Sequence, residues 1–174
     1  MSKILIIAEH DGESLAVATA KTVTGALAFG VETIDIAVFA AQPQAVAEQA
    51  AKLDGVTRVL AVADDDFARP LAARLAPEIQ ALAADYSHIL APSSTFGKDL
   101  LPRAAALIGV NQVSDIQEVI DERTFKRPIY AGNAIVTVRV ADGQTVLGTI
   151  RTASFAAASE GGSAEIEARS AQAE

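Results

Sequence analysis

Two loops hold most of the residues whose types could do chemistry. The first, Glu9–Ser14, follows an apolar run and places His10 among three carboxylates. A helix N-terminus at this point could receive a phosphate, but the carboxylates would repel it. We therefore interpret the loop as a helix-capping segment, with Asp11 or Ser14 as the cap and His10 solvated.

The second loop precedes Asp99, is rich in hydroxyl groups and superficially resembles a phosphate-binding P-loop. The P-loop spacing requires glycine where Pro92 stands and Ser or Thr where Asp99 stands. Proline lacks a backbone N–H that a phosphate needs, and aspartate adds a repelling charge. This argues against ATP hydrolysis. What is left is a helix start capped by Ser94 or Thr95, with Lys98 open to an anion or to a protein neighbour.

Two charged clusters complete the candidates. The run Asp64–Asp66 could attract a divalent cation, but no further acids follow at the spacing of an EF-hand. We interpret it as a solvated loop that caps a helix beginning at Phe67. The cations Arg123, Lys126 and Arg127 could pair with an acidic partner or balance the acids beside them.

Composition excludes several classes of site. The 174 residues contain no cysteine and only two histidines, which excludes thiolate metal sites, cysteine nucleophiles and histidine-rich metal sites. The formal net charge of −8 argues against binding to nucleic acid or to an anionic membrane. No apolar run approaches the ~20 residues of a membrane-spanning helix. The N-terminus leads directly into a strand pattern without a targeting signal, so we expect a bacterial cytoplasmic protein.

Hydrophobic periodicity predicts the elements that must position these loops. Over the first hundred residues, continuous apolar runs alternate with segments of helical spacing, which predicts a parallel sheet covered by helices. We expect Pro77 to kink or split the third helix. The expected strands are 4–8, 34–39, 59–62 and 89–91, and the expected helices are 14–27, 43–53, 67–84 and 99–108.

The pattern changes after about residue 112. Strand patterns at 116–120, 127–130, 134–140 and 145–150 follow one another without a helix, and Asp142-Gly143 is typical of a hairpin turn. We expect antiparallel strands to close a domain of residues 1–155. Residues 156–174 have the composition of a linker or disordered tail.

About residues 1–160 resemble the alpha subunit of the electron transfer flavoproteins, which are electron-carrying αβ heterodimers. The opening segment Lys3–His10 is similar to the family's start. Three signature segments carry the resemblance, and they are Pro92–Ala106, Ser114–Ile116 and Arg127–Ala134.

The resemblance implies a three-layer, mostly parallel, nucleotide-binding-like α/β fold of the adenine nucleotide alpha hydrolase kind, with antiparallel strands toward its C-terminal end. In the family, FAD is held by a C-terminal domain whose motifs are not found in these residues, and AMP is held by the beta subunit. No cofactor, catalytic residue or metal site is therefore expected in this chain. The complete heterodimer would carry electrons from dehydrogenases, such as those of fatty acid β-oxidation that act on acyl-CoA, to a membrane-bound quinone reductase.

The resemblance further implies that this domain packs against the beta subunit and is itself redox-inactive. A free-standing domain that binds an adenine nucleotide is the alternative. Under the first hypothesis the signature loops are interface and packing elements, and the interface residues are expected to be Ser94, Thr95, Phe96, Gly97, Lys98, Arg103, Tyr130, Gly132 and Asn133.

Overall fold

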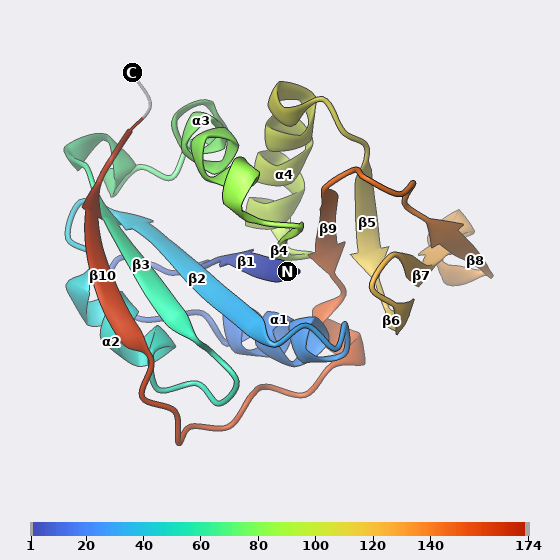
Figure 1. Cartoon of the computed structure of the whole chain (residues 1–174), viewed down its shortest axis with the longest axis horizontal. Helices are drawn as coiled ribbons and strands as arrows, with labels where there is room; N and C mark the ends of the chain where they lie inside the picture. Colours follow the sequence, from blue (N-terminus) through green and yellow to red (C-terminus); the bar gives the residue numbers. More distant parts are fainter. Residues whose placement is uncertain (1, 173–174) are drawn as a thin grey trace.

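The continuous apolar runs form a seven-stranded sheet in the computed structural model, which describes residues 2–172 (Figure 1). The strand order is β10-β3-β2-β1-β4-β9-β5, and every ladder is parallel. Parallel neighbours need crossover connections, which most of the helices supply. The strands are β1 (Lys3–Ile7), β2 (Thr33–Ala40), β3 (Arg58–Ala63), β4 (His88–Pro92), β5 (Gln112–Ile116), β9 (Val146–Ile150) and β10 (Glu165–Ser170).

Helices cover both faces of this sheet and complete three layers (Figure 1). Helices α1 (Val17–Leu27) and α2 (Gln44–Ala50) pack on one face, and α3 (Ala72–Leu82) and α4 (Thr95–Ile108) pack on the other. Alternate residues of β1 belong to two different buried clusters, one on each face, as expected for a strand that is buried on both sides. Single 3-10 turns are η1 (Asp65–Ala68), η2 (Ala83–Asp85), η3 (Tyr130–Gly132) and η4 (Thr152–Ser154).

The predicted three-layer α/β class is confirmed, while several helix boundaries differ from the prediction. Helix α1 begins at Val17 rather than at residue 14. The expected helix 67–84 is replaced by η1, α3 and η2, and α3 runs through Pro77 without a break. Helix α4 begins at Thr95, four residues earlier than expected, because Ser94 caps it.

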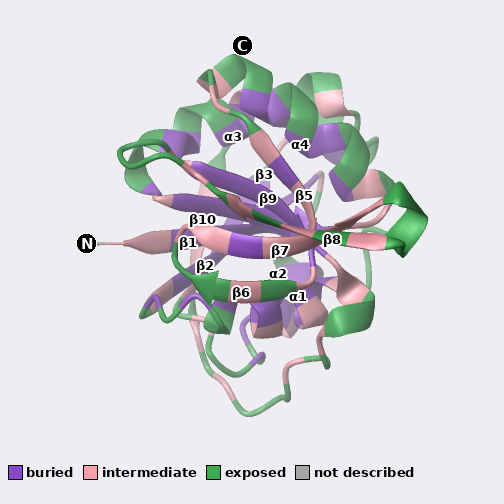
Figure 2. Ribbon diagram, turned by 90° about the vertical axis from the view of Figure 1, so that its right-hand side faces the viewer, coloured by how far each residue is buried: buried purple, intermediate pink, exposed green. Residues whose placement is uncertain are grey.

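A separate three-stranded antiparallel sheet extends from the β5 edge of the molecule (Figures 1 and 2). It consists of β6 (Glu118–Asp121), β7 (Thr124–Ile129) and β8 (Ala134–Arg139), with β7 in the middle. Phe125 is fully buried and attaches the small sheet to the core beneath α1. Figure 2 shows exposed residues along both outer strands, and within residues 2–172 each of these strands pairs only with β7.

The prediction of a hairpin at Asp142-Gly143 is wrong, because the strands on either side of it belong to different sheets. Strand β8 alternates between half-buried and exposed residues, whereas β9 is buried throughout and pairs with β4 and β5. An unbroken buried strand is typical of the interior of a parallel sheet. The expected strand 116–120 is likewise divided between β5 and β6, and the tight hairpin lies between β6 and β7.

Residues 156–174, expected to be a linker or disordered tail, contain strand β10, which pairs with β3 along its whole length. Ile166 packs against the core, and a carboxylate of Glu167 lies 2.9 Å from the Arg58 guanidinium. Arg58 also binds the buried carboxylate of Asp35 at 2.7 Å, so charge links three neighbouring strands. A polar composition hid this strand because only one of its residues is strongly apolar. Residues 173–174 of the expected tail lie outside the described residues.

Candidate functional site

The three signature segments meet around one surface hollow of about 520 Å³. Its walls come from the first turns of α4, from β5 and from β7, all within residues 98–128. Each segment contributes two residues, and Gln112 adds a carboxamide. The six signature residues are Lys98, Pro102, Ser114, Asp115, Arg127 and Pro128.

Helix α4 brings its side of the hollow into place through its cap. The Ser94 hydroxyl accepts a hydrogen bond from the Gly97 backbone N–H at 3.3 Å, which confirms the cap expected there. Lys98 and Pro102 are four residues apart and therefore share one face of the helix. The Lys98 side chain is exposed and has no carboxylate partner among residues 2–172.

Gly97 has a structural role in the same turn. A Cβ atom built on it would lie 2.0 Å from the carbonyl oxygen of Pro92. Backbone at that distance cannot give way cheaply. Any side chain at position 97 would therefore push the start of α4, and Lys98 with it, away from the end of β4.

The β5 side of the hollow is a β-bulge. The register between β5 and β9 shifts between Val113 and Ile116, and Asp115 adopts a positive φ of 61°. Successive residues of a regular strand point to opposite faces, whereas here Ser114 and Asp115 both line the hollow. The Asp115 backbone N–H donates to the Thr149 hydroxyl at 2.8 Å, which helps to hold the bulge. Such irregularities re-aim side chains and cluster near functional sites.

The charges that line the hollow are unequally matched. The Asp115 carboxylate is paired with Arg151 at 3.3 Å. The half-buried Arg127 instead donates from Nε to the Ser114 carbonyl oxygen at 2.7 Å and from a terminal nitrogen to the Ser114 hydroxyl at 2.9 Å. Within residues 2–172 the Arg127 guanidinium has no carboxylate partner, although it is fixed in orientation.

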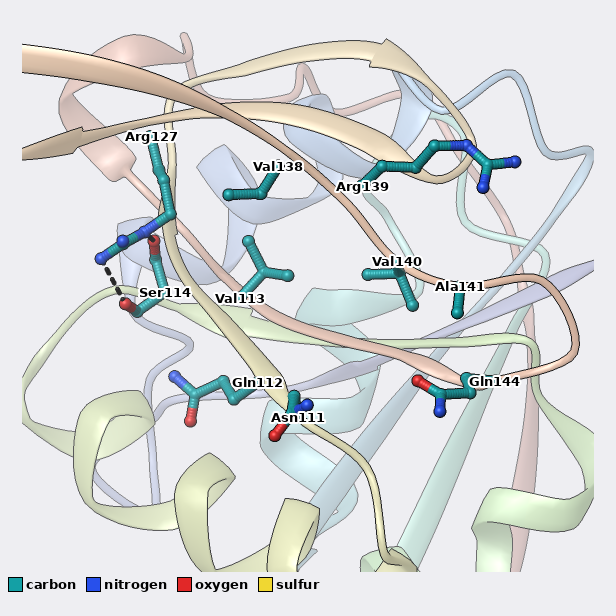
Figure 3. A pocket seen from close by; sticks show the side chains of 10 residues that line it. All are labelled: Asn111, Gln112, Val113, Ser114, Arg127, Val138, Arg139, Val140, Ala141 and Gln144. Carbon is teal, nitrogen blue, oxygen red and sulfur yellow. Dashed lines mark hydrogen bonds between the residues drawn. The ribbon is translucent and has the colours of Figure 1, made fainter.

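A second hollow of about 480 Å³ adjoins the first and lies between β5 and the small sheet (Figure 3). The two hollows share Gln112, Ser114 and Arg127. Figure 3 shows the valines Val113 and Val138 facing each other near the centre of this hollow. Carboxamide groups at its rim give the second hollow an apolar middle and a polar border.

The other expected interface residues do not all join this site. Thr95 and Arg103 are exposed on α4, and neither lines the 520 Å³ hollow. Phe96 is half-buried and packs against the core beneath α3 and α4.

The loop after β7 forms a separate exposed tip. Tyr130, Ala131 and Gly132 all have positive φ angles, and Tyr130 is 80% exposed. The Asn133 backbone N–H closes this turn by donating to the Tyr130 carbonyl oxygen at 3.0 Å. Three successive residues in a region that L-residues avoid suggest a constrained tip that presents Tyr130 to the surroundings.

The first loop differs from its expected role. His10 is not a solvated histidine, because it is half-buried and both ring nitrogens are bonded: Nε2 lies 3.0 Å from the Phe39 carbonyl oxygen, and Nδ1 accepts from the Gly12 N–H at 3.1 Å. Burial lowers the pKa of His10, although the Phe39 carbonyl opposes the shift. Asp11 accepts from two N–H groups within the loop, and α1 has no side-chain cap, so the predicted helix cap is wrong.

A hollow of about 530 Å³ beside this loop has the position at which open α/β sheets bind ligands. Its lining includes the carboxyl groups of Asp11 and Glu13 and the imidazole of His10, but no lysine or arginine. The phosphates of AMP or FAD would meet negative charge there without a counter-charge. The residues that line this hollow therefore do not fit a nucleotide.

The two charged clusters also resolve differently. The Asp64 carboxylate accepts from the Asp66 N–H at 2.8 Å and caps the short turn η1, which agrees with the expected cap, although the turn ends before α3. The cations of the 123–127 cluster diverge. Arg123 binds backbone carbonyls and Asp142, and Lys126 pairs with Glu118 at 2.9 Å. Neither pairs with the adjacent acids, and Arg127 has no carboxylate partner in the described part of the chain.

Sequence reasoning missed two polar residues. Gln112 lies on the wall shared by both hollows, and its Oε1 is buried without a hydrogen-bond partner in the described structure. His88 is fully buried, with Nε2 2.7 Å from the Glu122 carbonyl oxygen, and thereby connects the main sheet to the β6–β7 hairpin. Burial lowers the pKa of His88. A histidine at the start of an apolar run was the available signal for His88, while Gln112 carried none.

Comparisons with known proteins agree with the signature segments. A family model described as electron transfer flavoprotein domain matches residues 4–174. The electron transfer flavoprotein subunit alpha of Pseudomonas aeruginosa is 50% identical over 165 residues, which cover 94% of this chain and 53% of the relative. That of Paracoccus denitrificans is 47% identical over 157 residues, covering 90% and 50%. The mitochondrial subunit alpha of Dictyostelium discoideum is 42% identical over 173 residues, covering 95% and 48%.

The chain therefore spans about half the length of the curated relatives that it matches. Among residues 2–172, none of the helices has the length and apolar character needed to cross a membrane.

Proposed function

Since the chain belongs to the electron transfer flavoprotein family, we propose that it serves as the N-terminal α/β domain of an alpha subunit and packs against a beta subunit. The observation that carries the proposal is the similarity to alpha subunits across nearly the whole chain. The convergence of the signature segments on one surface hollow adds support, because it gives these segments a shared location.

The electron chemistry belongs to the complete heterodimer. We place its FAD outside residues 1–174 and its AMP on the beta subunit, so the isolated chain is redox-inactive. This agrees with the poor fit of a phosphate to the acidic first loop, which also speaks against the alternative of a free-standing nucleotide-binding domain. In a flavoprotein of this kind the cofactor does the redox step and the protein supplies binding and electrostatics.

The proposal extends to the complete protein. It would accept electrons from dehydrogenases of the acyl-CoA type and pass them to a membrane-bound quinone reductase. We place it in a bacterial cytoplasm, by analogy with the bacterial relatives. The expected interface consists of the exposed signature residues on α4 and on the 130–133 tip, with Ser94 and Gly97 acting from behind by shaping the helix start.

The direct test mixes the purified 174-residue chain with an electron transfer flavoprotein beta subunit of the same source and follows complex formation by sedimentation. We expect a 1:1 complex and no flavin absorbance in the chain alone. Absence of a complex, or a stoichiometric flavin band in the chain, contradicts the proposal.

The interface assignment has its own test in the full-length alpha subunit. We expect Lys98→Ala and Asn133→Ala to weaken heterodimer formation. If both variants assemble and retain FAD as the unmodified subunit does, these residues do not belong to the interface.

A further inference from the structure

The 520 Å³ hollow contains a positive charge that the chain itself does not neutralise. Lys98 and Arg127 line it, and neither has a carboxylate partner within residues 2–172. In contrast, the nearby cations Lys126 and Arg151 each have a carboxylate within 3.3 Å. Asp115 is the one acid in the lining, and its charge is already engaged by Arg151.

The Arg127 guanidinium is oriented in advance for an additional anion. Two of its nitrogens donate to the carbonyl and hydroxyl oxygens of Ser114, and these bonds use only part of its five N–H donors. The remaining donors keep the planar arrangement that recognises a carboxylate with two parallel hydrogen bonds. Half-burial reduces screening, which makes such a contact stronger than an ion pair in open solvent.

A second unsatisfied group lies on the same wall. The buried Oε1 of Gln112 can only accept a hydrogen bond, and it has no donor among the described residues. In Figure 3, Gln112, Ser114 and the Arg127 guanidinium lie on the same side of the β5 ribbon. The wall therefore offers donors for a carboxylate, and rotation of the Gln112 side chain would bring its buried oxygen to the hollow as an acceptor for an N–H group.

A ligand that satisfies both groups carries a carboxylate and an amide N–H together, which is the chemistry of an aspartate or glutamate residue in a polypeptide. An inorganic anion would leave Gln112 without its donor. We propose that this hollow receives an acidic side chain from the partner subunit, with Arg127 and Lys98 binding its carboxylate and Gln112 accepting from its backbone. The inference rests on the proposed function, because that function supplies the partner.

A local positive site on an otherwise acidic chain can determine where an acidic partner segment binds. With a net charge of −8, most of this surface repels acidic partners. One matched pair of unlike charges fixes where an acidic segment can dock and disfavours other registers. The apolar middle of the adjoining hollow, around Val113 and Val138, accommodates an apolar neighbour of the acidic residue.

The test measures the dissociation constant of the heterodimer by titration calorimetry. We expect Arg127→Gln to weaken the complex roughly tenfold or more, as for a desolvated charge pair, and Lys98→Gln roughly threefold, as for an exposed one. Matched controls are Arg69→Gln and Lys52→Gln, which remove exposed cations without a carboxylate partner elsewhere on the described surface. We expect the Lys98→Gln variant to fold normally, because the Lys98 side chain makes no described contact that folding requires. A weaker complex in this variant therefore cannot be attributed to misfolding.

Competition identifies the ligand chemistry. N-acetyl-glutamate N-methylamide should compete with the beta subunit, while the isosteric glutamine compound should not and sodium acetate should compete less well. If the complex forms but Arg127→Gln and Lys98→Gln bind the beta subunit as tightly as their controls, this inference is wrong and the proposed function stands. The same holds if the glutamate and glutamine compounds compete equally well. If the unmodified chain forms no complex, the proposed function fails, and the carboxylate inference fails with it.

Discussion

Two regions of the molecule can be compared as candidate sites. One is the loop after β1, and the other is the hollow between α4, β5 and β7. The loop has the residues that first suggest chemistry, and most of its polar groups bond within or next to the loop, although Oε2 of Glu9 is buried without a hydrogen-bond partner in the described structure. His10 uses both ring nitrogens, and Asp11 binds two N–H groups of its own loop. The hollow has plainer residues, but its two cations, Lys98 and Arg127, have no carboxylate partner within the described chain. Positive charge that the chain does not neutralise, rather than residue type, marks the more promising site.

The largest expected effect comes from the glycine that shapes the hollow. Gly97→Ala places a methyl group against the Pro92 carbonyl oxygen, and we expect a loss of about 3 kcal/mol in unfolding free energy. For a chain of this size that lowers Tm by roughly 6–12 °C, measurable by calorimetry. Gly143→Ala is the control, since it has open space and only a positive φ to tolerate, at about 1 kcal/mol. Equal effects of the two changes would remove the structural role given to Gly97.

The next effect concerns the orientation of Arg127. Ser114→Ala removes the hydroxyl acceptor and leaves the carbonyl, and we expect a loss of about 1 kcal/mol in unfolding free energy. The same variant should weaken the heterodimer, because the guanidinium is less firmly held. Chemical denaturation and calorimetric titration measure the two effects. Unchanged affinity in Ser114→Ala would mean that Arg127 needs no prior orientation.

A pH series tests whether the first loop is only structural. Burial lowers the pKa of His10 below its ordinary 6.5 in the folded state. The stability that neutral His10 contributes to the folded state is complete above pH 6.5. As pH falls below 6.5, the histidine of the unfolded chain binds a proton first, so this stability decreases until pH reaches the lower pKa of the folded state. Protonation removes the acceptor of the Gly12 N–H, a loss of less than about 1 kcal/mol. His10→Gln should reduce the slope of the unfolding free energy against pH, and the buried His88 should account for the slope that remains. An unchanged slope in His10→Gln contradicts the assignment.

The smallest expected effect on stability is at Lys98. Its side chain has no described ion pair, so Lys98→Gln should change the unfolding free energy by less than about 0.5 kcal/mol. Placed beside Gly97→Ala, it separates two adjacent signature residues into one that shapes the fold and one that is free to bind. A loss above about 1 kcal/mol in Lys98→Gln, measured by denaturant titration, would give Lys98 a structural role instead.

Local pattern predicted the parts of the fold that depend on local chemistry. Continuous apolar runs such as Ile4–Ala8 predict strands buried on both faces, and Ser94 indicates the start of α4. Strand β10 escaped prediction because its stability comes from pairing with β3 and from Glu167 meeting Arg58, which are contacts across about a hundred residues. The false hairpin before β9 shows the same gap, since a turn sequence does not say which sheet the next strand joins.

The residues of the candidate site were also predictable from the sequence only in part. Lys98 and the cluster containing Arg127 were identifiable from the sequence, including the option of an acidic partner. Their convergence was not, because the bulge at Ser114–Asp115 and the fold of the small sheet bring them together. Gln112 gave no sequence signal at all, since its importance lies only in an oxygen buried without a donor.

The most direct measurement records ¹⁵N spectra of the labelled chain while the beta subunit is added. The account predicts shifts of the Arg127 Nε–H and of the Gln112 side-chain amide, with little change in the backbone amides of residues 9–14. Shifts confined to the loop at 9–14, with Arg127 and Gln112 unmoved, would contradict the assignment of the partner to the hollow.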